Sequence, residues 1–252
     1  MRRLIRKRTY TVGVVALSLA LAVPGVAYGQ NGIQTIDGNI NPPAGGKNVA
    51  LSVEVAYVPG SDGIVAHATN AFIEFPSEGK VSTSAKIKKK GKTKKKRIPR
   101  CEPATVEGTN TADAIAACGK AQVGEGSAVA DVGGIDLPAT VTAFNGTPVN
   151  GHPSIVLHSR VEAASLTTVL VGEIMPPGGG GGPYGYSLNV PVPPLAGGAA
   201  AIERFQTTVK KKITKDVGYI SGKCGADHTN SFRGTFDYSD APQSVVTDEQ
   251  SC

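Results

Sequence analysis

The sequence predicts an all-β fold, an antiparallel β-sandwich of the jelly-roll or immunoglobulin-like kind with one short helix between Cys101 and Cys118. Three observations predict it. Short segments rich in Val and Thr recur along the chain, and long helical periodicity is missing. The 32 glycines and 17 prolines provide frequent turns between these segments. Short strands at close spacing, separated by turn residues, are typical of sandwiches.

The first expected strand is 49–58 (VALSVEVAYV), where apolar and polar residues alternate. The further expected strands are 68–75, 81–88, 121–131, 139–144, 154–162, 167–175, 184–192, 200–213, 217–223, 231–238 and 244–248. The segment 111–118 (TADAIAAC) is expected to be the helix, with Asn110 or Thr111 as its N-cap. The glycine-rich segment 176–183 is interpreted as a hairpin loop, so residues 30–252 are expected to form a single domain.

The N-terminus has the three parts of a secretory signal peptide. Basic residues between positions 2 and 8 precede an apolar stretch at 11–23, and Ala27 and Gly29 provide small residues just before Gln30. Thirteen apolar residues are too few to span a bilayer, although an uncleaved anchor is the alternative. We therefore expect residues 1–29 to be a signal peptide, with no transmembrane anchor in the remaining 223 of the 252 residues. The expected location is secreted, extracellular or in the cell envelope.

The four cysteines, Cys101, Cys118, Cys224 and Cys252, agree with export. An even number of cysteines in an exported chain predicts disulfide bonds, and four cysteines allow three pairings. The sequential pairing, Cys101 with Cys118 and Cys224 with Cys252, is preferred because each bond closes a local loop. A metal site made of all four is the alternative, but the spacings are wider than the close pairs typical of zinc sites.

One segment carries most of the positive charge. The chain has 26 basic residues, of which five lie near the N-terminus and ten lie between Lys86 and Arg100, so that 11 remain against 20 acidic residues. The body is therefore acidic and a basic lysine-rich loop, 86–100, is attached to it. The candidate anion-binding residues are Lys86, Lys88, Lys89, Lys90, Lys92, Lys94, Lys95, Lys96, Arg97 and Arg100. A smaller cluster follows at Lys210–Lys212 and Lys215.

The lysine-rich loop predicts a partner with many negative charges, either an anionic cell-surface polymer or lipid headgroups. No aromatic residue lies among the lysines, so specific nucleic-acid recognition is not expected. If a strand at 81–88 is followed by a return at Ile98, the loop has its tip at Lys90–Lys92, and we expect this tip to be disordered without an anion. Self-association of the basic loop with the acidic body is a further alternative.

Catalytic motifs are missing from the sequence. It contains no G-x-S-x-G nucleophile elbow and no H-E-x-x-H zinc motif, and the four histidines fall in unrelated segments. We therefore expect a non-enzymatic binding or envelope-associated protein without cofactor or metal. One alternative is a structural extracellular protein whose basic loop is merely solvated. The other is a hydrolase whose carboxylates are brought together by the fold.

Three segments resemble a family of exported bacterial β-sandwich proteins of unknown function. They are Ile98 to Ala128, with Cys101, Cys118 and KAQVGEGSA; PYGYSLNVPVPPL at 183–195; and GYISGKC at 218–224 with FRGTFDYSD at 232–240 and Cys252. The resemblance implies a sandwich with two local cysteine pairs. It implies no activity and no site residues. The lysine-rich loop is an addition to the family's pattern.

Overall fold

The computed structural model describes residues 32–89, 91–178 and 182–252. Within these ranges an eleven-stranded antiparallel sheet has the order β1-β3-β13-β8-β9-β10-β11-β12-β4-β17-β18, which confirms the all-β antiparallel class. Its strands are β1 (Ile33–Asn41), β3 (Ala50–Val58), β4 (Ala68–Pro76), β8 (Gln122–Asp131), β9 (Asp136–Asn145), β10 (Ser154–Val161), β11 (Leu166–Met175), β12 (Tyr184–Pro191), β13 (Ala201–Val209), β17 (Thr229–Tyr238) and β18 (Ser244–Ser251).

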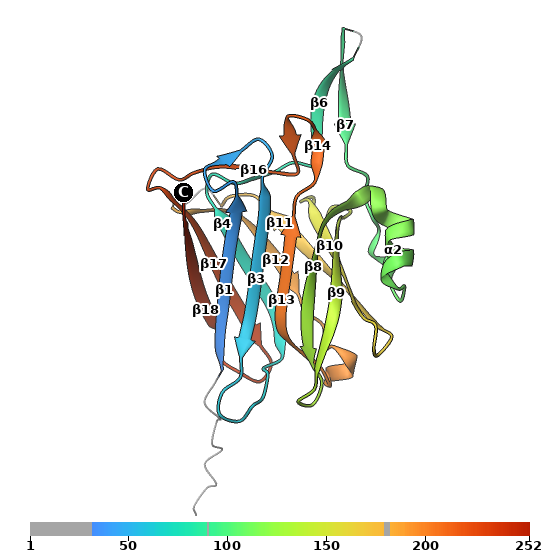
Figure 1. The fold of residues 1–252 in the computed structure, drawn as a ribbon, viewed down its shortest axis with the longest axis vertical. Helices are drawn as coiled ribbons and strands as arrows, with labels where there is room; N and C mark the ends of the chain where they lie inside the picture. The colour runs from blue at the N-terminus through green and yellow to red at the C-terminus, as the bar shows by residue number, and fades with distance from the viewer. Residues whose placement is uncertain (1–31, 90, 179–181) are drawn as a thin grey trace, which may run out of the picture.

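The sheet curls over until its two edges meet. Figure 1 shows β1, β3, β13, β8 and β9 in front of β11, β12, β4 and β17, so the two layers enclose one interior. The edge strands are joined through side chains, because the Gly38 N–H donates to the Asp248 carboxylate at 2.9 Å and the Ile40 N–H donates to Gln250 Oε1 at 2.9 Å. The result is a flattened cylinder whose closing seam lies between β1 and β18.

Gly38 allows the seam to close. A Cβ atom at this position would overlap the ring of Phe232, which is fully buried on β17. The glycine therefore lets the aromatic ring lie directly against the β1 backbone. Close approach of this kind is a common reason for glycine inside a strand.

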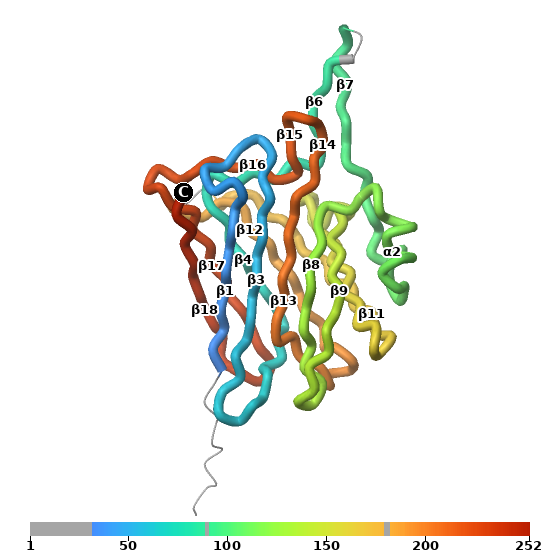
Figure 2. The backbone as a smooth tube through the Cα atoms, viewed as in Figure 1, coloured from blue at the N-terminus to red at the C-terminus, as the bar shows by residue number. Residues whose placement is uncertain are grey.

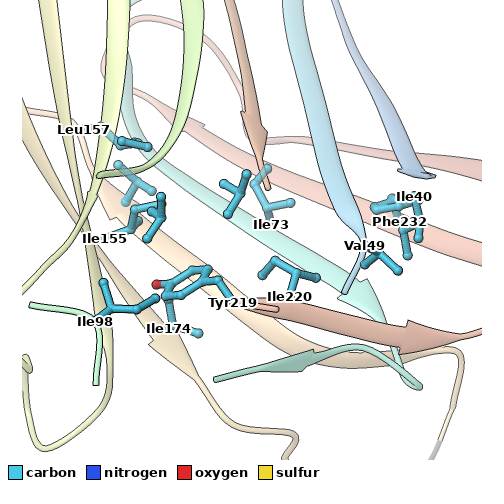
Figure 3. Close-up of a cluster of buried hydrophobic side chains, with 14 of the residues drawn as sticks. Ile40, Val49, Ile73, Ile98, Ile155, Leu157, Ile174, Tyr219, Ile220 and Phe232 are labelled. Carbon is cyan, nitrogen blue, oxygen red and sulfur yellow. The ribbon is translucent and has the colours of Figure 1, made fainter. Parts of the chain in front are cut away.

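The core consists mainly of aliphatic side chains from both layers, together with Phe232, Phe236 and Tyr219. Figure 3 shows these side chains pointing toward one another across the interior. In β1 the burial alternates strictly, with Gln34, Ile36 and Ile40 buried and their neighbours exposed. The two-residue period of a strand with one buried face accounts for this alternation.

The helices cover the outside of the sheet beside β9 and β10. They are α1 (Pro103–Val106), α2 (Thr111–Cys118) and the 3₁₀ helix η1 (Gly119–Ala121). A second 3₁₀ helix, η2 (Ala196–Gly198), lies elsewhere, in the connection between β12 and β13. The α2 helix has the expected bounds, and the Asn110 side chain caps it by accepting from the Asp113 N–H at 2.9 Å. Val106 and Ala114 are buried against Phe144 and Val156.

Both predicted disulfides are present. Cys101 is bonded to Cys118 and Cys224 to Cys252, with Cα–Cα distances of 5.5 and 5.7 Å. The first bond closes the segment that holds α1 and α2, and the second ties the end of β18 to the loop after β16 (Ile220–Lys223). Disulfide bonds of this number indicate an oxidising compartment. Among the described residues, no helix is long and apolar enough to cross a membrane.

Some elements differ from the sequence-based expectation. β1 was not expected, because Gln34 and Gly38 occupy inward positions and interrupt the apolar alternation. Three expected strands are each divided in two: 81–88 into β5 (Lys80–Val81) and β6 (Ser84–Lys89), 200–213 into β13 and β14 (Lys212–Thr214), and 217–223 into β15 (Val217–Gly218) and β16. A two-residue strand, β2 (Gly45–Gly46), pairs with β16. The expected signal peptide, 1–29, lies outside the described residues.

Candidate anion-binding site

The basic segment forms a β-hairpin that projects from one end of the cylinder (Figure 1). Its strands are β6 and β7 (Lys92–Arg97), which pair only with each other among the described strands. Gly91 has a φ of 73°, a conformation that glycine adopts without steric cost and that two-residue hairpin turns require. We call β6 and β7 the lysine hairpin, and the end of the cylinder from which it projects the hairpin end.

The lysine-rich loop expected at 86–100 is therefore formed for most of its length by two paired strands. The expectation of a tip near Lys90–Lys92 is consistent with the two strands, although Lys90 itself lies outside the described residues. The return strand begins at Lys92 rather than at Ile98. The short turn explains the difference, because it pairs Lys89 with Lys92 directly and brings the lysines themselves into register.

Positive charge covers both faces of the hairpin. Residues that are opposite each other in register share a face, so Lys86, Lys88, Lys95 and Arg97 lie on one side. Lys92, Lys94 and Lys96 lie on the other side, together with the small apolar base formed by Ala85 and Ile87. All seven of these basic residues are exposed. None of them forms an ion pair with another described side chain, so their charge is available to a partner.

The base of the hairpin is fixed to the cylinder. Ala85 and Ile98 are buried in the main core. The Ser82 N–H donates to the Tyr219 carbonyl at 2.8 Å, and the Asn145 side chain donates to the Pro99 carbonyl at 2.8 Å. The Cys101 N–H donates to the Asn145 carbonyl at 2.9 Å, directly before the disulfide. The structure thus holds a projecting cationic arm by a well-bonded base.

The second lysine cluster lies beside the first. β14 packs against β6, and Figure 2 shows the β14–β15 hairpin next to the base of the lysine hairpin. Lys212 and Lys215 are exposed there. Lys210 forms an ion pair with Glu125 at 2.8 Å, so its charge is partly neutralised. No pattern in the sequence indicates that these clusters, more than a hundred residues apart, meet in the fold.

The fold gathers the lysines at one end of the cylinder. Every lysine in the described part of the chain lies at the hairpin end: Lys47, Lys80, the hairpin lysines, Lys120, Lys210–Lys212, Lys215 and Lys223. The connections at the opposite end are 58–67, 131–136, 161–166, 191–201 and 238–244. They contain no lysine or arginine, and they carry Asp62, Asp131, Asp136, Glu162 and Asp240. The topology alone brings these scattered lysines to the same end of the cylinder.

Arg100 completes the predicted set of anion-binding residues. It is exposed after the buried Ile98, at the hairpin end and beside the first disulfide. The backbone of Lys89 belongs to β6, whereas its side chain and the whole of Lys90 are not among the described parts.

The histidines do not gather into one site. His67 contacts Asp240 at 2.6 Å at the end opposite the hairpin, whereas His152 contacts Glu173 at 2.6 Å at the hairpin end. Burial alone would raise the pKa of Asp240, but hydrogen bonds from the ring and backbone of His67 outweigh it and lower that pKa below its ordinary value. No group of three or more His, Cys, Asp or Glu side chains suited to a metal occurs among the described residues.

The fold and the site define a class: an antiparallel all-β protein with two local disulfides and a cationic hairpin at one end. Comparison of the chain with protein-family models, with curated proteins and with solved structures found no match. The resemblance to exported bacterial β-sandwich proteins therefore stays a prediction.

Proposed function

We propose that this chain is an exported, non-enzymatic binding protein that holds an anionic polymer outside the cytoplasm with its lysine hairpin. One observation carries the proposal. Exposed basic side chains cover both faces of a projecting arm, and they have no ionic partner among the described residues. Such a set of free charges gains free energy by releasing the counterions of a polyanion.

The distribution of charge favours a polymer over a flat membrane. A bilayer surface meets one face of a ribbon, which would leave the charges of the other face pointing away. Flexible polymer chains can contact Lys86 and Lys95 on one face and Lys94 and Lys96 on the other at the same time. The hairpin also has no aromatic residue of the kind that anchors proteins at membrane interfaces.

Export is supported by two features. Residues 1–29 have the charged, apolar and small-residue parts of a signal peptide, and all four cysteines are paired. N-terminal sequencing of the protein recovered from outside the producing cells should begin at Gln30. Membrane-bound protein whose sequence begins at Met1 would contradict cleavage of the signal peptide.

The binding test uses long-chain polyphosphate as the probe and measures affinity over a series of salt concentrations. Each phosphate that is neutralised on a flexible chain contributes about 0.7 to the slope of log K against log salt. The double variant Lys86→Gln/Lys95→Gln should lower the slope by about 1.4.

A matched control changes net charge by the same amount elsewhere. Ala163→Glu/Ala164→Glu adds two negative charges at exposed positions in the 161–166 connection, opposite the hairpin. This control should bind nearly as the parent does. Equal losses of affinity for polyphosphate in both double variants would show that net charge, and not the hairpin, determines binding. Binding to anionic vesicles but not to polyphosphate would show that the ligand is a lipid headgroup and not a polymer.

A further inference from the structure

The interior of the cylinder contains an apolar cavity of about 160 Å³. Its walls come from both layers and include Val53 and Val55 on β3, Ile155 and Leu157 on β10, and Leu188 on β12. A dry cavity of similar volume, lined by aliphatic and aromatic side chains, can hold a molecule the size of benzene. The space is therefore large enough for a ring or a short hydrocarbon chain.

Polar atoms without partners face this apolar space. The Tyr219 hydroxyl and Thr207 Oγ1 are buried and have no hydrogen-bond partner among the described residues, and both residues line the cavity. Buried polar atoms are almost always paired in folded proteins. Each of these atoms is consequently a place where a bound molecule could supply the missing partner.

Tyr219 is the more completely buried of the two, with a relative exposure of 1%. Its backbone is held from two sides, because its N–H donates to the Lys211 carbonyl at 2.7 Å and its carbonyl accepts from the Ser82 N–H at 2.8 Å. Figure 3 shows its oxygen beside Ile98, with Ile155 and Ile174 close to the ring; Ile155 and Ile174 both line the cavity. Burial raises the pKa of Tyr219, so the hydroxyl keeps its proton and can donate a hydrogen bond.

We propose that the cavity binds a small, uncharged, mainly apolar molecule whose carbonyl-type oxygen accepts a hydrogen bond from the Tyr219 hydroxyl. The aliphatic walls fit the hydrocarbon part of such a ligand. The Tyr219 hydroxyl is a neutral donor. Lys80 also lines the cavity, but it is exposed to solvent. A neutral donor in an apolar wall favours a ketone, aldehyde or ester over a carboxylate, because burying a carboxylate without a cation is costly.

The test compares two probes with the same number and connectivity of heavy atoms, acetophenone and isopropylbenzene, of which only the first has an acceptor oxygen. Binding is measured by calorimetry on the full mature chain. The unsubstituted protein should bind both probes and prefer acetophenone. Tyr219→Phe keeps the ring and removes the hydroxyl, so it should weaken acetophenone binding about five- to tenfold and leave isopropylbenzene binding unchanged.

A second variant tests the location independently. Val53→Phe places a larger side chain in the cavity wall and should abolish the binding of both probes. Failure of the unsubstituted protein to bind either probe would overturn the proposal, and so would an equal response of the two probes to Tyr219→Phe. Should Val53→Phe not fold, the comparison of the two probes on Tyr219→Phe still decides, because that variant keeps the packing of the ring.

Discussion

Lys86 and Lys95 stand directly opposite each other in the lysine hairpin, and this register leads to a prediction in which stability and binding change in opposite directions. Like charges that face each other across two strands destabilise the pair, and opposite charges stabilise it. Lys95→Glu converts the first arrangement into the second. The substitution should therefore strengthen the hairpin while it weakens polyanion binding.

The magnitudes follow from the exposure of the pair. Exposed cross-strand pairs contribute at the low end of their range, so the change from repulsion to attraction should stabilise the hairpin by about 0.5–1 kcal/mol. Amide hydrogen exchange in β6 and β7 should slow by about two- to fivefold. Because the introduced carboxylate would also pair with Lys86, two contacts with the polymer are lost, and the salt slope for polyphosphate should fall by about 1.4.

Hydrogen exchange followed by mass spectrometry on the 84–97 segment measures the first effect, and the salt series measures the second. Lys95→Gln is the control, because it removes the repulsion without adding an attraction and removes one contact instead of two. It should give a smaller slowing of exchange and a slope change of about 0.7. Exchange that is unchanged or faster in Lys95→Glu would refute the register argument, since the two side chains would then not face each other.

Three further changes test other parts of the structure. Gly38→Ala should destabilise the protein by about 1–3 kcal/mol in urea unfolding, because its Cβ overlaps the Phe232 ring; an unchanged midpoint would mean that the seam is open. Thr207→Val should be neutral or stabilising by up to about 1 kcal/mol in the same assay, because it removes a buried hydroxyl without a partner; a clear loss would reveal a missed hydrogen bond. The lowered pKa of Asp240 stabilises the folded protein above the ordinary pKa of aspartate, and this stabilisation is lost as the pH falls below about 4. Asp240→Asn should therefore flatten the dependence of the free energy of unfolding on pH in that range. Identical profiles for the variant and the parent would contradict the His67 pairing.

Local sequence patterns predict much of this fold. The alternation in 49–58 and the turn residues around Asn145-Gly146 mark strands whose bounds agree with the structure to within a few residues. The Asn110 cap and the helix at 111–118 follow from local hydrogen bonding. The disulfide pairing was also predictable, because each bond closes a short loop. These features depend on neighbours in the chain, which a single sequence displays.

The remainder depends on contacts between distant residues. β1 was not expected because its inward positions include Gly38. Glycine is needed at this position to make room for the Phe232 ring, which lies almost two hundred residues later in the sequence. The packing of β14 against β6, and the gathering of Lys47, Lys120 and Lys223 at one end, depend on how the strands are arranged in space and not on any local pattern. The cavity and the unpaired hydroxyl of Tyr219 have no local signal, because GYISG contains nothing that distinguishes a tyrosine inside a cylinder from one on its surface.

Every lysine in the described part of the chain lies at the hairpin end, and the connections at the opposite end contain no lysine or arginine, so the molecule has an electric dipole along the cylinder. In the field of a polyanion this dipole experiences a torque that turns the hairpin forward and the acidic connections backward. The torque acts within about one Debye length, which is about 8 Å at physiological ionic strength, so orientation begins before the first contact forms. Because the hairpin projects beyond the rest of the hairpin end, it enters this layer first (Figure 1). Its charges also lie farthest from the centre of the molecule, so the force on them produces the largest torque.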